Sequence, residues 1–163
     1  MTLAAPAPIG PAHDLAGFDC GDVSLNDWLA RRALANQASG ATRTYVVAED
    51  GRVVAYYALA SGALACAVAT GRVRRNMPDP IPVAILARLA IDRSWQGRGL
   101  GRALVRDAAL RVLAAAEAIG VRGLVVHAIS DEAAAFYRAL GLAPAPSDPR
   151  LLMATLAELQ AAL

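Results

Sequence analysis

The segment with the clearest chemical signature is a glycine cluster at residues 96–102, which reads Gln-Gly-Arg-Gly-Leu-Gly-Arg. It lies between an apolar stretch that predicts a strand and a periodic stretch that predicts a helix. Glycines let a backbone turn sharply and approach a ligand, and the first turn of a helix offers unpaired N–H groups at a positive dipole end. The cluster therefore predicts an anion site suited to a pyrophosphate, with Arg98 and Arg102 adding charged contacts. The alternative is a tight turn of structural value only.

The spacing of the glycines narrows the choice of ligand. A P-loop needs Gly-Lys-Ser/Thr, and the chain contains no lysine. A dinucleotide fingerprint needs G-x-G-x-x-G, whereas this cluster is G-x-G-x-G. The pattern Gln-x-x-Gly-x-Gly after an apolar strand, here Gln96, Gly99 and Gly101, is instead typical of an acetyl-CoA loop.

Tyr137 is the candidate general acid, because a phenol can donate its proton to a departing sulfur. The alternative is that Phe136 and Tyr137 are simply core aromatics of a helix. His127 ends an apolar strand and is expected to be structural. The two cysteines and the two distant histidines offer no metal-ligand spacing, so no metal is expected.

Basic residues form a further group of candidates, and all 16 of them are arginines. Arginine pairs with phosphate in a bidentate manner and stacks on bases, so clustered arginines favour contact with RNA. The candidates are the loop arginines Arg72, Arg74 and Arg75, the strand arginine Arg88, and the helix arginines Arg31 and Arg32. Arg88 is either paired internally or reaches into a substrate cleft. The alternative for the loop is a solvated segment that keeps an alanine-rich protein soluble.

Composition limits the broad class of protein. The chain has 163 residues, 56% of them hydrophobic and 18% charged, which predicts one folded domain and excludes general disorder. The net charge of +2 is too small for a histone-like binder. Residues 53–71 carry no charge, but Ser61-Gly62 and two tyrosines favour a buried strand over a membrane span. No signal peptide is evident, and reduced thiols fit a cytoplasmic location.

Periodicity and turn residues predict an α/β domain without an internal repeat. Residues 1–12 are expected to be a loose arm, and Ser24 is expected to cap a helix over 24–37. Asp50-Gly51 predicts a hairpin between strands 43–48 and 53–59. Prolines predict an irregular, exposed loop over 72–82. The remaining elements are strands 83–91, 121–129 and 151–156, helices 100–119 and 131–140, and a helical tail over 157–163.

These motifs resemble the GCN5-related N-acetyltransferases (the GNAT family). The resemblance rests on Ala-Arg-Leu-Ala-Ile-Asp at 87–92, the glycine cluster, Ala-Phe-Tyr at 135–137 and Gly141-Leu142. Segments 18–21, 25–29, 56–60 and 76–82 are similar, more narrowly, to acetyltransferase toxins of bacterial toxin–antitoxin pairs. The resemblance implies one GNAT domain over residues 1–163, with a mixed, mostly antiparallel central sheet flanked by helices and a V-shaped splay at the acetyl-CoA site.

The resemblance also implies roles for individual residues. Tyr137 would be the general acid, and a main-chain N–H within Leu89, Ala90 and Ile91 would meet the oxyanion. The other cofactor-binding residues implied are Gln96, Gly97, Arg98, Gly99, Leu100, Gly101, Arg102, Ser130 and Phe136. Ser130 stands where the family often has an asparagine that contacts the cofactor, and Leu142 stands where it commonly has phenylalanine.

The acceptor is expected to be an α-amine. Its pKa of about 7.7–8 leaves a useful neutral fraction near pH 7, whereas a lysine amine near 10.4 would need a base. The apolar strand before the loop carries no carboxylate ahead of Asp92. The toxin resemblance implies aminoacyl-tRNA as acceptor, a ribbon-helix-helix antitoxin as partner, and a homodimer in which residues 64–68 could take part. Acetylation of a small amine or a protein N-terminus, and a non-catalytic CoA-binding partner domain, are the alternatives.

Overall fold

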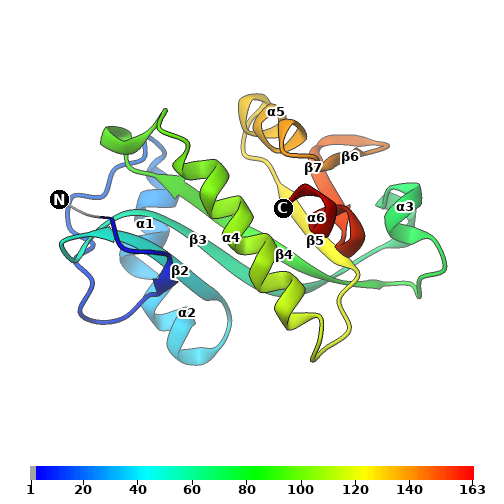
Figure 1. Cartoon of the computed structure of the whole chain (residues 1–163), viewed down its shortest axis with the longest axis horizontal. Coiled ribbons are helices and arrows are strands. Elements are labelled where there is room, and N and C mark those ends of the chain that lie inside the picture. Colours follow the sequence, from blue (N-terminus) through cyan, green and yellow to red (C-terminus); the bar gives the residue numbers. More distant parts are fainter. Residues whose placement is uncertain (1–2) are drawn as a thin grey trace. The chain divides into compact units, whose positions relative to one another are not determined.

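The computed structural model describes residues 3–163 and shows a seven-stranded sheet with helices beside it (Figure 1). The strand order is β1-β2-β3-β4-β5-β7-β6. The strands are β1 (Ala7–Pro8), β2 (Arg43–Glu49), β3 (Arg52–Leu64), β4 (Ile81–Ile91), β5 (Gly123–His127), β6 (Ala143–Ala145) and β7 (Asp148–Thr155). The helices are α1 (Val23–Arg31), α2 (Ala33–Ser39), α3 (Gly71–Arg74), α4 (Leu100–Ala115), α5 (Asp131–Ala139) and α6 (Leu156–Ala162). Two short 3-10 helices, η1 (Cys66–Val68) and η2 (Arg93–Trp95), complete the set of elements.

The predicted fold class is confirmed. Strand pairs β1–β2, β2–β3, β5–β7 and β6–β7 are antiparallel, and β4 pairs with β5 in parallel, so the sheet is mixed and mostly antiparallel. The chain divides into two compact units. Unit 1 contains the described residues up to Ala60 and Ala87–Asp107; unit 2 contains Ser61–Leu86 and Ala108–Leu163. The splay at the acetyl-CoA site stays a prediction.

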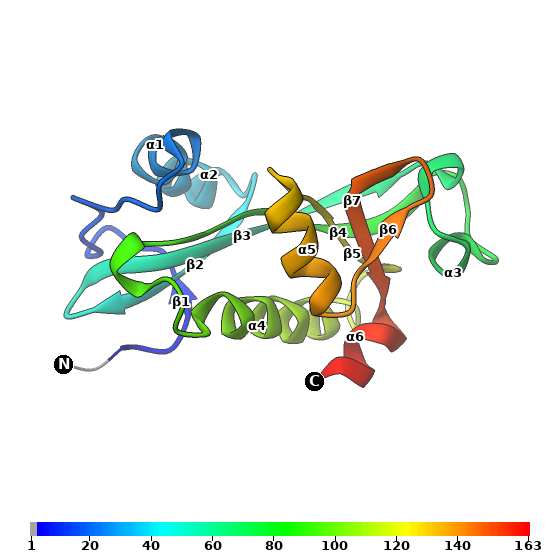
Figure 2. The same ribbon diagram turned by 90° about the horizontal axis from the view of Figure 1, so that it is seen from above.

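Unit 1 is built on the β2–β3 hairpin, whose two turn residues both have positive φ, 51° at Asp50 and 84° at Gly51. Successive residues of a strand point to opposite faces of the sheet. Accordingly, the Tyr56 hydroxyl donates to the Leu25 carbonyl of α1 at 2.6 Å, whereas the Tyr57 hydroxyl hydrogen bonds Asp107 in α4. Figure 2 shows α1 and α2 on one side of β2 and β3 and the start of α4 on the other. The two tyrosines therefore anchor a helix on each face of the hairpin.

The first helical segment differs from its prediction in cap and continuity. Asp22, not Ser24, is the N-cap of α1, because its carboxylate accepts the Leu25 N–H at 3.2 Å and the Ser24 hydroxyl at 2.6 Å. A carboxylate accepts more strongly than a hydroxyl, so the acid two residues earlier starts the helix. The predicted single helix is interrupted at Arg32, which separates α1 from α2.

The expectation of a loose arm is wrong for the described part of residues 1–12. β1 pairs with β2, the Ala4 N–H donates to the Ala48 carbonyl at 2.9 Å, and Ile9 is buried. An apolar side chain and an open strand edge explain the difference, since burying Ile9 brings the backbone against the free edge of β2. Residues 1 and 2 lie outside the described residues.

Unit 2 contains β5, β7 and β6 and the first half of β4, which pairs with β5 over Ala84–Leu86 and Leu124–Val126. Its hydrophobic core includes Val73, Ile81, Val125, Leu151 and Met153. Both α3 and α6 pack beside β7 (Figure 1). A capping box starts α6: the Thr155 hydroxyl accepts the Glu158 N–H at 3.2 Å and the Glu158 carboxylate accepts the Thr155 N–H at 3.1 Å.

Segment 72–82 is more regular than its prolines predict. Thr70 caps α3, the buried Val73 anchors it, and β4 already begins at Ile81 and includes Pro82. Proline is tolerated near the start of a strand, which explains the earlier onset. The long helix α4 ends at Ala115 rather than at the predicted residue 119. Over residues 3–163 no helix has the length and apolarity needed to cross a membrane.

Candidate functional site

The glycine turn joins η2 to α4 in unit 1. Gly97 and Gly99 have φ of 77° and 81°, a left-handed conformation that L side chains rarely adopt, and no other atom lies within 4 Å of where a Cβ would stand at either glycine. Glycine is therefore favoured at these two positions by the positive φ and not by a lack of space for a side chain. Residues 96–99 are exposed, and α4 follows at Leu100 with the Ala103 N–H donating to the Gly99 carbonyl at 3.2 Å. An exposed turn that leads into a helix start is suited to receive an anionic group.

Gln96 holds this turn in place. Its side-chain amide donates to the Cys20 carbonyl and to the Ile91 carbonyl, both at 2.9 Å. One side chain therefore ties the turn to the end of β4 and to the segment before α1. Because the amide hydrogens are engaged with protein carbonyls, the structure gives Gln96 a positioning role.

Asp92 is a further positioning residue that the sequence reasoning missed. One carboxylate oxygen accepts the Ser94 N–H at 3.0 Å and the Ser94 hydroxyl at 2.7 Å, and the other accepts the Asp19 N–H at 3.1 Å. Arg52 lies 3.6 Å from the second oxygen. Burial alone would raise the pKa of Asp92, but the Ser94 bonds, the Asp19 N–H and Arg52 outweigh it and lower the pKa below 3.8. The ionised carboxylate thus caps η2 directly before the glycine turn.

The two arginines of the turn have different surroundings. The Arg98 guanidinium lies 4.6 Å from the centroid of the Trp95 ring, a cation–π contact within the same turn. Arg102 is exposed on the first turn of α4. Both can supply positive charge at the turn, and Arg98 is held by an aromatic surface rather than by a carboxylate.

The end of β4 precedes this turn and carries the residues proposed to face the thioester. Leu89 and Ile91 are half-buried and Ala90 is buried. Arg88 is exposed, donates to the Ala87 carbonyl at 2.9 Å, and lies 5.4 Å from the centroid of the Trp28 ring. Among residues 3–163 it forms no ion pair, and its reach into a substrate cleft stays a prediction. Arg31 and Arg32 are exposed at the end of the same helix as Trp28 and just after it.

Tyr137 lies on α5 in unit 2 and is 6% exposed. Burial raises the pKa of its phenol to about 12, and no charged neighbour contributes. The hydroxyl therefore keeps its proton at neutral pH, as a general acid must. Phe136, half-buried, meets the Tyr137 ring edge-on with centroids 5.1 Å apart.

Ser130 begins α5, where its hydroxyl accepts the Ala133 N–H at 3.1 Å. The oxygen that could contact a cofactor thus already serves as helix cap, although a capping hydroxyl keeps its own O–H to donate. His127, expected to be a structural core residue, is exposed at the end of β5. No set of three potential metal-ligating side chains comes together within residues 3–163.

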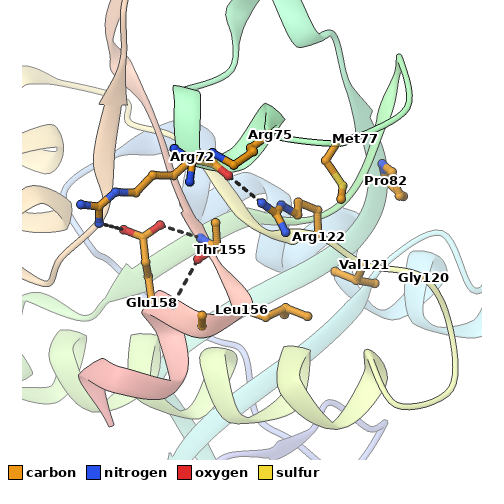
Figure 3. Close-up of a pocket in the computed structure, with 11 residues that line it drawn as sticks. Arg72, Arg75, Met77, Pro82, Gly120, Val121, Arg122, Thr155, Leu156 and Glu158 are labelled. Carbon is orange, nitrogen blue, oxygen red and sulfur yellow. Dashed lines mark hydrogen bonds and ion pairs between the residues drawn. The ribbon is translucent and has the colours of Figure 1, made fainter.

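The arginines of segment 72–75 lie in unit 2 beside an arginine that the sequence reasoning missed. Arg122 donates to the Val73 carbonyl at 2.9 Å. It also donates to the Arg72 carbonyl at 2.6 Å (Figure 3). Arg72 in turn pairs with Glu158 at 3.5 Å. Arg74 and Arg75 are exposed. The sequence around Arg122 gave little indication of this role, because its partners are backbone carbonyls about fifty residues earlier in the chain.

Each unit therefore holds part of the predicted residue set. The glycine turn, the end of β4 and Arg31, Arg32 and Arg88 lie in unit 1. Ser130, Phe136 and Tyr137 lie in unit 2 with Arg72, Arg74 and Arg75.

Comparison with known proteins gives one family match and several similar proteins. Residues 40–141 match the family described as acetyltransferase (GNAT) domain. A tRNA-acetylating toxin of Mycobacterium tuberculosis (strain ATCC 25618 / H37Rv) is 54% identical over 149 residues, 91% of this chain and 90% of the relative.

Solved structures of the toxin AtaT are similar in fold. AtaT in complex with acetyl-methionyl-tRNAfMet has a TM-score of 0.89 at 29% identity and covers 98% of both chains. A variant of AtaT with tyrosine replaced by phenylalanine, bound to the C-terminus of the antitoxin AtaR and to acetyl-CoA, has a TM-score of 0.83 at 29% identity, covering 99% of this chain and 97% of the other.

Proposed function

Because the chain belongs to the GNAT family of acetyltransferases, we propose that it is a toxin that transfers acetyl from acetyl-CoA to the α-amino group of aminoacyl-tRNA and so blocks translation. The observation that carries the proposal is the 54% identity with a tRNA-acetylating toxin across 91% of the chain. The solved AtaT structures, with acetyl-methionyl-tRNA in one and acetyl-CoA in another, support the same substrate pair.

Acetyl-CoA is the acetyl donor, and the glycine turn suits its pyrophosphate. Residues 97–99 are exposed, and their main chain can approach phosphate oxygens because Gly97 and Gly99 carry no side chain. Arg98 and Arg102 add positive charge. Gln96 and Asp92 keep the turn in this conformation before any ligand arrives. Such preorganisation lowers the ordering cost of binding. Ser130 and Phe136 are proposed to complete the cofactor contacts.

The transfer itself needs an acceptor, an oxyanion site and an acid. The neutral α-amine attacks the thioester carbonyl carbon, a C–N bond forms, and the C–S bond breaks. A main-chain N–H among Leu89, Ala90 and Ile91 is proposed to stabilise the oxyanion, and Tyr137 is proposed to give its proton to the departing sulfur. The ammonium formed on the acceptor releases its proton to water. The raised pKa of Tyr137, about 12, supports the acid role, since the phenol is protonated whenever the amine is neutral near pH 8.

The arginines are proposed to hold the RNA. Arg74 and Arg75 are exposed and can reach phosphates, and Arg72 lies beside them on α3. Arg31, Arg32 and Arg88 form a second exposed group near Trp28 in unit 1, where a guanidinium on an aromatic ring resembles the surfaces on which unpaired bases stack. Each group is proposed to contact the tRNA.

Partners and cellular context follow the toxin relatives. An antitoxin is proposed to neutralise the chain, on the support of the AtaT structure bound to the C-terminus of an antitoxin. We propose that this antitoxin is of the ribbon-helix-helix class, that the toxin forms a homodimer, and that it acts in the cytoplasm as one catalytic domain spanning both units.

The test uses radiolabelled acetyl-CoA with charged tRNA, comparing the wild type with Tyr137→Phe. Phenylalanine keeps the buried ring and removes only the hydroxyl, so the fold is retained while the rate falls about 10²–10⁴-fold. Uncharged tRNA is the matched control and stays unlabelled. If small amines or free peptide N-termini are labelled while charged tRNA remains unlabelled, the acceptor is one of those amines and not aminoacyl-tRNA. An unchanged rate in Tyr137→Phe would remove Tyr137 from the mechanism.

A further inference from the structure

The three residues 19–21 form a short connecting segment before α1 that is hydrogen bonded on two sides. One side faces the residues around the glycine turn: the Asp19 N–H donates to the Asp92 carboxylate at 3.1 Å. The Cys20 carbonyl accepts the side-chain amide of Gln96 at 2.9 Å. Because Asp92 and Gln96 lie directly before the glycines, the position of the turn determines the position of the connecting segment.

Asn26, half-buried on α1, holds the other side of the connecting segment. Its side-chain carbonyl accepts the Cys20 N–H at 2.9 Å, and its amide donates to the Asp19 carboxylate at 3.1 Å. The same Asp19 oxygen accepts the Gly21 N–H at 2.9 Å. The Gly21 N–H and the Asn26 amide lower the pKa of Asp19 below its ordinary value of 3.8, so the carboxylate that accepts them is ionised at neutral pH. One side chain of α1 therefore fixes two successive residues of the connecting segment.

The helix that carries Asn26 also carries Trp28, beside the arginines proposed to contact the acceptor in unit 1. The Trp28 ring stacks on the Tyr56 ring, with centroids 5.8 Å apart and planes inclined by 11°. The Arg88 guanidinium lies 5.4 Å from the centroid of the Trp28 ring. Since the Tyr56 hydroxyl donates to the Leu25 carbonyl at 2.6 Å, the place of the Trp28 ring is determined by the position of α1.

These contacts form a closed loop within unit 1, so the glycine turn is connected to Trp28 by two routes. The first runs through the connecting segment and Asn26, entirely by hydrogen bonds. The second runs from the Gln96 amide to the Ile91 carbonyl at 2.9 Å and back along β4 to Arg88. Arg88 is exposed and meets α1 through one cation–π contact, whereas Asn26 makes two hydrogen bonds of defined direction. The route through Asn26 is therefore the stiffer of the two.

We propose that Asn26 is a positioning residue that transmits the position of the glycine turn to α1, so that CoA bound at the turn sets Trp28 in place for the acceptor. Residues 96–99 are exposed, so the ligand meets the turn from solvent, and a shift of Gln96 is carried to the Cys20 carbonyl and on to Asn26. Only the acceptor's contact with this surface rests on the proposed function. The transmission from turn to helix does not depend on which amine is acetylated.

The experiment uses the two tryptophans of the chain, which lie at opposite ends of this route. Trp95 is in η2 beside the turn, and Trp28 is on α1. The full-length protein is labelled with 5-fluorotryptophan, and Trp28→Phe assigns the two fluorine signals. The probe is 3′-phosphoadenosine 5′-diphosphate, the part of CoA that carries the pyrophosphate without the pantetheine arm. In the wild type both signals should shift with one Kd.

In Asn26→Ala the Trp95 signal should shift with the wild-type Kd, whereas the Trp28 signal should lose most of its shift. Asn26→Asp is the second variant: it retains an acceptor for the Cys20 N–H but sets a carboxylate against Asp19, and it should lose the Trp28 shift as well. Asn36→Ala, at an equally half-buried asparagine on α2, is the matched control and should keep both shifts. Alanine favours helix at both positions, so a weakened helix does not explain a loss.

Steady-state acetylation of charged tRNA is measured on the same proteins. Asn26→Ala should lower kcat about 10–100-fold and leave KM for acetyl-CoA unchanged, because a misplaced helix disturbs the approach of the reacting groups more than the binding of the donor. A residue with a merely structural role would lower Tm without separating the two fluorine signals or kcat from KM.

The positioning role is overturned by a full Trp28 shift in Asn26→Ala, by joint loss of the Trp95 and Trp28 shifts, or by equal losses in Asn36→Ala. A wild-type Trp28 signal that does not respond to the probe overturns it too. If the Trp28 shift depends on Asn26 but the wild type does not acetylate charged tRNA, the proposed function alone fails. If the wild type acetylates charged tRNA and Asn26→Ala has the same kcat, the positioning role alone fails.

Discussion

Replacing Asp92 by asparagine should weaken the hydrogen bonds that hold the segment directly before the glycine turn. The substitution keeps the size of the side chain but removes its charge and replaces one acceptor oxygen by an N–H donor. In the native structure both oxygens face donors, Ser94 on one side and the Asp19 N–H and Arg52 on the other. Whichever way the amide is turned, its NH₂ group points at a donor, and one side of the network is lost.

The size of the effect follows from these contacts. A hydrogen bond to a charged group contributes about 1.5–3 kcal/mol, and the partly exposed Arg52 adds at most about 1 kcal/mol. Losing one side of the network and weakening the other should therefore cost roughly 2–4 kcal/mol of unfolding free energy. For a chain of this length, 1 kcal/mol corresponds to about 2–4 °C, so Tm should fall by roughly 4–16 °C.

Thermal unfolding and acetyl-CoA titration of Asp92→Asn measure the effect on stability and on the turn. Asp27→Asn, an exposed acid on α1, is the control for removing a negative charge. Because folding lowers the pKa of Asp92, its contribution is complete above the ordinary value of 3.8 and is lost as pH falls through the lower folded value. The difference in Tm from wild type should thus be constant near neutrality and shrink in strong acid. Equal Tm values for the two variants at pH 7 would refute the assigned role.

Three further predictions concern the ligand contacts and the acid. Gly99→Ala should lower the affinity for acetyl-CoA about 5–30-fold, as measured by calorimetry, because a Cβ at φ 81° costs about 1–2 kcal/mol even though no atom obstructs it. The control Gly10→Ala, at an equally open position without positive φ, should bind acetyl-CoA with wild-type affinity. Replacing both Arg74 and Arg75 by glutamine should reduce the slope of log K for tRNA binding against log salt concentration by about 1.4–1.8. If the slope equals that of the control Arg106→Gln, the two arginines do not contact phosphates. The pH profile of kcat/KM should rise with the acceptor amine near pH 8 and then stay flat to about pH 10, because the phenol ionises only near its pKa of about 12; a decline at pH 9 would contradict Tyr137 as the acid.

The parts of the fold that could be predicted from sequence are those governed by neighbours in the chain. Asp50-Gly51 specified its hairpin because both residues accept positive φ, and the structure has them there. The helical periodicity that begins at Leu100 and the helix that begins at Asp131 were also predictable, because both depend on residues close together in the chain. The glycine cluster was recognisable because its spacing and its place before a helix are both local properties.

The parts that could not be predicted depend on distant partners or on very short elements. Asp92 accepts an N–H from a residue 73 positions away, and Arg122 donates to a carbonyl 49 positions away, so neither partnership leaves a local pattern. β1 and β6 have only two and three residues, too few for any periodicity. The dual use of Ser130, as helix cap and as candidate cofactor contact, also became visible only once the position of the Ala133 N–H was known.

The segment before α1 is hydrogen bonded to the region of the glycine turn: the Gln96 side chain donates to the Cys20 carbonyl, and the Arg93 N–H donates to the Asp19 carbonyl. A shortened clone that starts at α1 would retain every side chain proposed to perform acetyl transfer, and yet its turn would lose both anchors. Affinity tags and gene fusions should therefore not replace the residues that precede α1.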